Sequence, residues 1–294
     1  MPPYTRARQA RPTTRGGGAK MRWGLDVAQH QLTWDEIVSR IRFAEEEGFE
    51  GAWVFDHLTA LYGDPDGPCL EGWTLLAALA ARTSRIRLGT LVTGMTHRHP
   101  SVLAAEVVTV DHVSGGRVEC ALGAAWNRDE HRELGIAFPG VRERMERLEE
   151  GIQVLRLLMS GERVSFVGRH YRLDGALYRP HPIQRPHPPI WIGAKGPKLG
   201  LPIVGRYADV WHTWATDYRA KWDVVRRAAE EAGRDPEGIV RASSLSISEP
   251  WDEVRRAFDG HVANGVSYLV VEWPTEGRGR LERFVGTVMP TLEG

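Results

Sequence analysis

The sequence predicts an α/β fold, specifically a closed (β/α)8 TIM barrel with insertions after the fourth strand. Short apolar segments alternate with amphipathic helical segments eight times, which is typical of βα units that build a parallel sheet. Eight units within 294 residues match the size of such a barrel. The segment 52–55 is bulky and uninterrupted, as expected for a strand covered on both faces. Periodicity does not demonstrate closure, so a doubly wound open sheet is the alternative.

The first 20 residues differ in composition from the rest of the chain. Residues 1–20 contain four arginines, one lysine and three consecutive glycines, with no acidic residue and no apolar segment of the kind found in secretory signals. Such a segment buries too little apolar surface to fold. We therefore expect a disordered tail over residues 1–20 and a single barrel domain over residues 21–294.

Bulk composition excludes several classes of protein. Acidic and basic residues balance at 38 each, so the net charge gives no reason to expect nucleic acid or a membrane surface as a partner. No apolar run approaches the ~18 residues that span a bilayer. The two cysteines, Cys69 and Cys120, lack a CxxC spacing, which makes a disulfide framework or a thiolate metal site unexpected and favours a reducing cytoplasm.

The first half of the chain gives four βα units. Strands are predicted at residues 21–27, 52–55, 87–93 and 117–123. Thr33 and Glu36 form a capping-box pattern for the first helix, which Gly48 ends. A polar loop over 58–68 precedes an apolar helix over 70–81, and its length is unusual for a βα connection, which suggests a site loop. A helix over 101–113 follows Pro100.

The second half repeats the pattern after an excursion. A polar insertion over 124–139 precedes an amphipathic helix over 143–159 and a surface hairpin over 164–173. Strands then follow at 189–193, 209–213, 239–247 and 268–272. The helices between and after them are expected at 198–207, bounded or interrupted by Pro202, and at 217–232, 251–264 and 281–292.

The carboxyl ends of the predicted strands carry the candidate functional residues, because barrel enzymes place their sites there. Asp56 and His57 follow the second strand, and histidine titrates near neutral pH; these two residues could instead simply start a loop. Small residues at 123–125 and 193–196 would let backbone N–H groups approach an anion, or would only form tight turns. Tryptophans at these ends suit a planar heterocycle or cover the barrel mouth; they are Trp126, Trp211, Trp214 and Trp273.

Two other chemistries fit the sequence less well. His97 and His99, together with Glu130 and His131, include residue types that bind metals. However, His97 and His99 lie in a loop directly before Pro100, and no acidic residue follows at the spacing of a barrel metal site, so no metal is expected. A Gly-x-Ser-x-Gly elbow is absent, which argues against Ser-His-Asp hydrolysis.

The chain from Met21 onwards resembles the luciferase-like monooxygenase superfamily, and within it the branch of oxidoreductases that use the deazaflavin coenzyme F420. The segments that carry this resemblance are residues 48–57, 86–93, 115–118, 122–127, 130–131, 134–135, 188–193 and 208–211. Together they cover the whole chain except the tail.

The resemblance implies a barrel whose mouth holds a planar cofactor. It implies that His57, beside the redox carbon, acts as acid or base and that Asp56 fixes its ring or binds the cofactor edge. It also implies a non-proline cis peptide at Leu91–Val92. Some relatives carry a catalytic Glu where this chain has Trp126, which argues against the sugar-phosphate dehydrogenase subgroup and makes Trp126 a candidate wall of the site, together with Trp211. The implied cofactor-binding residues are Asp56, His57, Leu91, Val92, Thr93, Ala124, Ala125, Asn127, Gly193, Ala194, Lys195 and Gly196.

The sequence thus predicts an oxidoreductase that transfers a hydride between F420 and an organic small molecule. The first alternative is an FMN-dependent monooxygenase that uses dioxygen on the same barrel. The second is a degenerate barrel that binds a cofactor without catalysis. The resemblance also implies a homodimer, with the apolar helices after the second and third strands as its expected interface.

Overall fold

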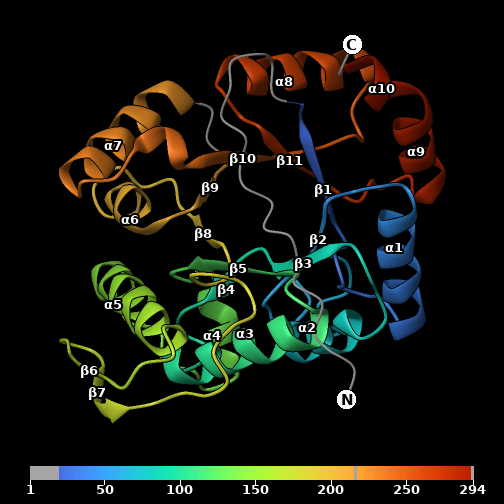
Figure 1. Cartoon of the computed structure of the whole chain (residues 1–294). Helices are drawn as coiled ribbons and strands as arrows, with labels where there is room; N and C mark the ends of the chain where they lie inside the picture. Colours follow the sequence, from blue (N-terminus) through green and yellow to red (C-terminus); the bar gives the residue numbers. More distant parts are fainter. Residues whose placement is uncertain (1–19, 215–216, 293–294) are drawn as a thin grey trace, which may run out of the picture.

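The computed structural model describes residues 20–214 and 217–292, and in it eight parallel strands close into a barrel (Figure 1). The barrel strands are β1 (Arg22–Asp26), β2 (Gly51–Val54), β3 (Arg87–Thr90), β5 (Val118–Gly123), β8 (Ile190–Gly193), β9 (Val210–His212), β10 (Val240–Leu245) and β11 (Tyr268–Val271). β11 pairs with β1, and β3 pairs with β5, which closes the circle. The predicted barrel is therefore confirmed and the open-sheet alternative is wrong. Apart from residue 20, the predicted tail lies outside the described residues.

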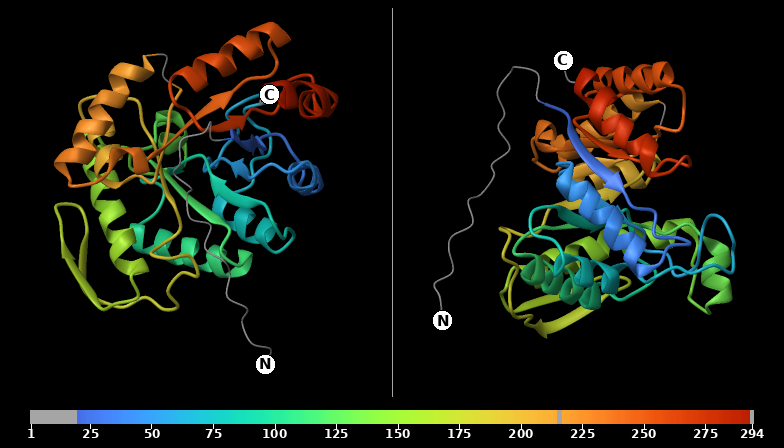
Figure 2. Two further views of the ribbon diagram at one scale, coloured as in Figure 1. Left: turned by 45° about the horizontal axis from the view of Figure 1, so that its top comes forward. Right: turned by 90° about the vertical axis from the view of Figure 1, so that its right-hand side faces the viewer.

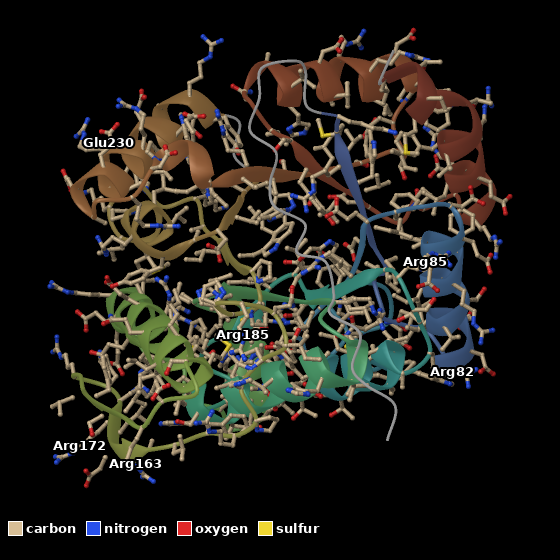
Figure 3. All side chains as sticks on the ribbon, viewed as in Figure 1. Arg82, Arg85, Arg163, Arg172, Arg185 and Glu230 are labelled. Carbon is tan, nitrogen blue, oxygen red and sulfur yellow. The ribbon has the colours of Figure 1, made fainter. Side chains whose placement is uncertain are left out.

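Helices surround the strands, as the view tilted towards the barrel axis shows (Figure 2). They are α1 (Trp34–Glu46), α2 (Gly72–Ala80), α3 (Pro100–Ser114), α5 (Val141–Met159), α6 (Gly200–Tyr207), α7 (Tyr218–Glu231), α8 (Trp251–Ala263) and a final run of α9 (Arg278–Arg283), η2 (Phe284–Val288) and α10 (Met289–Leu292), with the short η1 (Pro236–Gly238) before β10. No described helix is long and apolar enough to cross a membrane. Charged side chains such as Arg82, Arg85 and Glu230 project outwards from this layer (Figure 3).

Local sequence signals explain where the helices begin and end. The predicted capping box of α1 is present: the Glu36 N–H donates to Thr33 Oγ1 at 3.3 Å, and the Thr33 N–H donates to the Glu36 carboxylate at 2.9 Å. Helix α3 begins at Pro100 and ends at Gly115, whose φ of 70° lies in the left-handed region that glycine adopts without strain.

The barrel interior is filled by large side chains, so it is a packed core and not a pore. Trp53 and Trp191 lie with ring centroids 4.4 Å apart, and Tyr268 packs edge-on against Trp191. A Cβ at Gly51 would come within 2.5 Å of the Tyr268 hydroxyl, so this glycine leaves the room that the tyrosine needs. Because the interior is closed, ligands can enter only at a mouth of the barrel.

Two segments differ from the prediction. The third strand is not continuous over 87–93: it stops at Thr90 and resumes as β4 (Thr93–Gly94), and the Leu91–Val92 peptide between them is cis, as the resemblance implied. The polar insertion contains a helix that periodicity did not reveal, α4 (Arg128–Glu133). Its sequence has no apolar face, and it is anchored by two polar side chains that become buried, Glu130 and His131.

The predicted hairpin is confirmed as β6 (Val164–Val167) and β7 (Arg172–Ala176), an antiparallel pair beside α5 at the edge of the molecule (Figure 1). Its turn is held by a carboxylate from α5. Glu150 accepts the backbone N–H groups of Arg169, His170 and Tyr171 at 2.8–3.1 Å. The hairpin is thus a structural excursion that leaves the barrel mouth free.

His212, at the end of β9, should make stability sensitive to acid. Its side chain is fully buried, with Nε2 3.2 Å from Ser244 Oγ, and burial lowers its pKa from 6.5 to about 3. The unfolded chain binds a proton below pH 6.5 while the folded chain does not, so this contribution to stability is complete above pH 6.5 and is lost as the pH falls towards 3.

We expect His212→Asn to remove this dependence. Its free energy of unfolding, measured by urea denaturation between pH 4 and 6.5, should change less steeply with pH than that of the wild type, by about 1.4 kcal/mol per pH unit. Ser244→Ala keeps the histidine and serves as the control, with the wild-type slope. Equal slopes for wild type and His212→Asn would show that the buried ring is not responsible.

Candidate active site

A cavity of about 600 Å³ opens at the carboxyl-terminal mouth of the barrel. Its walls come from the ends of β2, β3, β5, β8 and β9 and from helices α4 and α5. The volume is within the range of small-molecule sites. The lining residues are Phe55, Asp56, His57, Leu61, Tyr62, Leu91, Val92, Gly94, His97, Gly123, Ala124, Ala125, Trp126, Asn127, Glu130, His131, Met145, Gly193, Ala194, Lys195, Gly196, Thr213 and Trp214.

Most of the residues singled out in the sequence lie in this cavity. Those brought together on its wall are Asp56, His57, Leu91, Val92, Ala124, Ala125, Trp126, Asn127, Gly193, Ala194, Lys195 and Gly196. Thr93 does not reach it: its buried hydroxyl accepts a hydrogen bond from Trp73 Nε1 at 3.1 Å and contacts the Thr90 hydroxyl at 2.5 Å. Thr93 therefore supports the wall from behind.

Trp211 is also placed differently from the expectation. Its side chain is fully buried and packs against Tyr218 and Trp222 of α7, with ring centroids 4.7 and 6.2 Å away. Successive residues of a strand point to opposite faces, and Trp211 takes the face that meets the helices. The expectation that it walls the site is wrong, and Trp214, two residues beyond β9, lines the cavity instead.

Asp56 is the buried anion at the centre of the site, with 2% of its surface exposed. Arg98 donates to both of its carboxylate oxygens at 2.8 Å, and the Gly94 N–H donates to Oδ2 at 2.9 Å. His97 Nδ1 lies 3.3 Å from the same oxygen. Burial alone would raise the pKa of Asp56, but the hydrogen bonds from His97 and Arg98 bring it below its usual value. The carboxylate therefore stays ionised and holds the β4 segment in place.

His57 faces the cavity beside a second buried carboxylate. His57 Nδ1 lies 2.9 Å from Glu130 Oε2, while Glu130 Oε1 accepts the backbone N–H groups of Leu58 and Thr59 at 2.7 and 3.2 Å. Burial would raise the pKa of Glu130, but the hydrogen bonds and the His57 ring lower it to about 2. Trp126 packs edge-on against His57, with centroids 5.6 Å apart.

Glu130 also lies close to His97 and His131. One ligand-type atom from each of these three side chains lies within 4.8 Å of the others, a spacing that a metal ion could use. Hydrogen bonds already account for most of the arrangement. His131 Nδ1 donates to the Asn127 carbonyl at 2.6 Å, leaving Nε2 to accept from Thr96 Oγ1 at 2.7 Å. His97 Nε2 is buried 3.7 Å from Glu130 Oε2 without a hydrogen bond.

Another part of the cavity wall is built from backbone and small side chains. A Cβ at Gly123 would come within 2.6 Å of Val92 Cγ2, so the chain after β5 can approach Val92 only because this residue is glycine. Ala125 turns away from β5 with a φ of 57°. A Cβ at Gly196 would meet no atom within 4 Å, so the space beside this residue is open, and Lys195 has no ion pair among the described residues. A flat ligand with an anionic group fits this wall.

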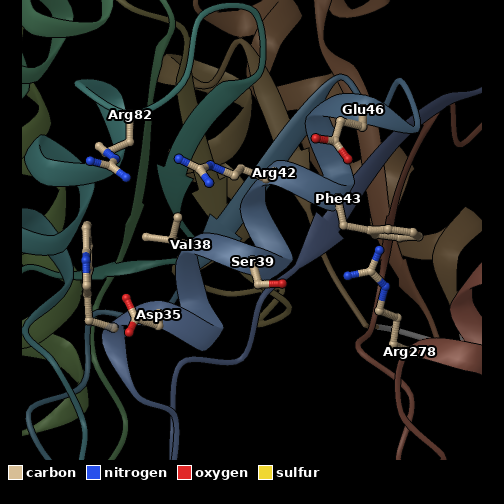
Figure 4. A pocket seen from close by; sticks show the side chains of 9 residues that line it. Asp35, Val38, Ser39, Arg42, Phe43, Glu46, Arg82 and Arg278 are labelled. Atoms are coloured by element: carbon tan, nitrogen blue, oxygen red, sulfur yellow. The ribbon is translucent and has the colours of Figure 1, made fainter.

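A smaller cavity of about 370 Å³ lies on the outside of the barrel along α1 (Figure 4). Arg42 and Arg82 line one side of it, and Arg278 packs over the Phe43 ring at 4.8 Å on the other. No buried carboxylate or histidine faces it among the described residues. The groups that can move a proton are therefore gathered at the barrel mouth and not here.

The chain matches the sequence model of a family described as luciferase-like monooxygenase over residues 15–281. The match extends over the whole described barrel apart from its last helical turns. The protein belongs to the luciferase-like monooxygenase family. The family resemblance seen in the sequence is therefore confirmed.

The chain is also similar to curated relatives, among them two dehydrogenases. An F420-dependent hydroxymycolic acid dehydrogenase of Mycobacterium tuberculosis is 34% identical over 76% of this chain and 61% of its own length. An F420-dependent glucose-6-phosphate dehydrogenase of Nakamurella multipartita is 32% identical over 81% of this chain and 71% of its own length. The match thus spans less than two thirds of the first relative.

A solved structure has the same overall fold. An F420-dependent secondary alcohol dehydrogenase, solved with an F420–acetone adduct, superposes with a TM-score of 0.83 over 94% of this chain and 100% of its own. The two sequences are 20% identical, so the likeness establishes the fold alone.

The sequence did not reveal three residues of this site as acid–base or positioning groups. In the sequence, Glu130 and His97 suggest only metal ligands, and no pattern singles out Arg98. The sequence did contain one signal for Glu130: it is an acidic residue in the segment 122–135 that carries the family resemblance. Its partner is 73 residues away in the chain, and no periodicity reports a contact of that kind.

Proposed function

We propose that this protein is an F420-dependent oxidoreductase that interconverts an alcohol and a carbonyl compound with a largely apolar body. The observation that carries the proposal is that His57 and the small residues after β5 and β8 line the same cavity. A titratable ring thereby faces the place where a flat cofactor fits. The names of the two curated relatives support F420 as that cofactor.

The residues present fit F420. The backbone of Gly123 and Gly193, with Ala124 and Ala125, forms a flat wall on which the ring system would lie. Ala194, Lys195 and Gly196 precede helix α6, where backbone N–H groups and an unpaired ammonium suit a phosphate. When bound, F420 supplies a deazaflavin ring carbon that accepts or donates a hydride. Leu91 and Val92 would support the ring face that the substrate does not use.

The chain itself handles the proton and excludes water. In the direction of oxidation, His57 Nε2 would accept the hydroxyl proton of the alcohol; in reduction, the same nitrogen would return the proton. Asp56 holds β4 and, through it, the edge of the cofactor site. Trp126 and Trp214 line the cavity, where they would shield a bound cofactor and substrate from bulk solvent.

The side chains on the substrate side favour an apolar substrate over a sugar phosphate. Leu61, Tyr62, Met145 and Trp214 line the cavity together with Trp126. In the sugar-phosphate dehydrogenase subgroup a catalytic Glu takes the position of Trp126, so this chain lacks that acid. A hydroxyl or carbonyl carbon carried on an alkyl or aromatic body would fill such a site without leaving a phosphate unpaired.

Parallel fluorescence titrations with F420 and FMN test the cofactor. We expect F420 to bind with a dissociation constant in the micromolar range or tighter, and FMN to bind more weakly. Preference for FMN, together with oxygen consumption in the presence of reduced FMN, would instead support the monooxygenase alternative that the family also includes. Binding of neither would overturn the proposal and favour a barrel without redox function.

The proposal extends to a homodimer through helices α2 and α3. On α3, the apolar side chains of Val102 and Val113 are 51% and 46% exposed. Pairing of two copies would cover these side chains. Light scattering of the purified protein at micromolar concentration should give twice the mass of one chain, and a monomeric mass would contradict this part of the proposal.

A further inference from the structure

We propose that Glu130 is a positioning residue that fixes the tautomer of His57 and holds the loop after β2 against the active site. This inference rests on the proposed function, because it assigns a role to a group beside the acid–base residue. Glu130 lies on α4, in the insertion after the fourth barrel strand. The insertion therefore contributes a residue to the active site.

The environment of Glu130 is built for an anion. Its side chain is fully buried, and both oxygens are engaged: Oε2 by His57 Nδ1 and Oε1 by the backbone N–H groups of Leu58 and Thr59. Such a set of donors stabilises the ionised form, in keeping with a pKa of about 2. A buried carboxylate with these partners accepts hydrogen bonds and donates none.

The direction of these hydrogen bonds decides which nitrogen of His57 faces the cavity. Because ionised Glu130 can only accept, Nδ1 must carry a hydrogen and donate it. Nε2 then carries the lone pair in the neutral ring, and it has no hydrogen-bond partner among the described residues. The ring is therefore ready to accept a hydroxyl proton from the cavity, and the charge of Glu130 stabilises the imidazolium that results.

The same carboxylate shapes the substrate side. The loop that begins at Leu58 carries Leu61 and Tyr62, both of which line the cavity. Its first two N–H groups are tied to Glu130, a residue 72 positions further along the chain. Loss of this tie would free the start of the loop as well as the ring. Glu130 thus links the proton-handling group to the wall that contacts the substrate.

Glu130→Gln is the sharpest test, because it preserves volume and inverts one hydrogen bond. The new amide N–H would point at His57 Nδ1 and favour the tautomer with its hydrogen on Nε2. We expect nitrogen-15 NMR of the protein without cofactor to show His57 protonated on Nδ1 in the wild type and on Nε2 in the variant. His57→Asn identifies the signal by its disappearance.

Kinetics of the same variant provide the second readout. We expect kcat for oxidation of an aliphatic secondary alcohol with F420 to fall about 10²-fold, within the range of acid–base effects, while the dissociation constant of F420 changes less than about threefold. Glu130→Asp keeps the charge, so it should retain the wild-type tautomer and part of the wild-type activity. It is the variant to measure if Glu130→Gln does not fold.

Glu133→Gln is the matched control, since Glu133 lies on the same helix with 60% of its side chain exposed, and it should behave as the wild type. An unchanged His57 tautomer in Glu130→Gln would overturn the inference, as would unchanged kcat in a protein that turns over F420. Loss of wild-type activity on treatment with EDTA would also overturn it, by assigning Glu130 to a metal ion. A tautomer change in a protein that does not bind F420 would support the positioning role while the proposed function fails.

Discussion

Replacing His57 by alanine is expected to lower kcat for hydride transfer about 10²–10⁴-fold, the usual range for loss of a general acid or base. The ring faces the cavity with its Nδ1 engaged by Glu130, so Nε2 is the nitrogen placed to exchange a proton with substrate. F420 affinity should change only a few fold, because most of the proposed cofactor contacts come from the backbone of the small-residue segments after β5 and β8. Steady-state kinetics with F420, combined with fluorescence titration of the cofactor, measure both quantities.

His170→Ala is a suitable control, because His170 lies on the hairpin and pairs with Glu146 of α5, away from the cavity. It should leave kcat unchanged. If His57→Ala also left both activity and cofactor affinity unchanged, His57 would have no role in proton transfer, and a cofactor-binding barrel without catalysis would become the better account.

Asp56→Asn is expected to lower the free energy of unfolding by about 3–5 kcal/mol, the usual cost of removing one partner of a buried ion pair. Asp56 accepts two hydrogen bonds from Arg98, whose side chain is only 11% exposed. The variant leaves that guanidinium with a weaker partner, and the Asn amide group meets donors where the carboxylate offered only acceptors. Urea denaturation of the protein without cofactor, followed by circular dichroism, measures the change.

The exposed pair of Asp129 and Arg132 offers a matched control, with side chains 71% and 67% exposed. Asp129→Asn should change stability little, because surface ion pairs contribute little. Arg98→Met completes a double-mutant cycle: if the pair is coupled, the double variant should lose less than the sum of the two single variants. A loss for Asp56→Asn well below the usual cost of breaking a buried ion pair would show that solvent or Glu71, 3.1 Å from Arg98, compensates for the missing charge.

Local sequence pattern was enough to predict the barrel and the edge at which its site lies. Alternation of short apolar strands with helices predicted eight βα units, and each strand appears within a few residues of its expected place. The pair Asp56–His57 and the small residues after the fourth and fifth barrel strands could be assigned to the mouth because chain direction fixes which end of a parallel strand they occupy. These are properties of local pattern and chain order.

The contacts between these residues, and the directions in which their side chains point, depend on the tertiary structure. Trp211 was placed at the correct strand end but points to the helices, and Thr93 lies behind the wall, because a break after Thr90 changes the strand's course. The partnership of His57 with Glu130 depends on how closure of the barrel brings the insertion after β5 against the loop after β2. Local periodicity specifies a buried face, whereas a contact between segments 73 residues apart depends on register and closure, which are fixed only when the whole barrel forms.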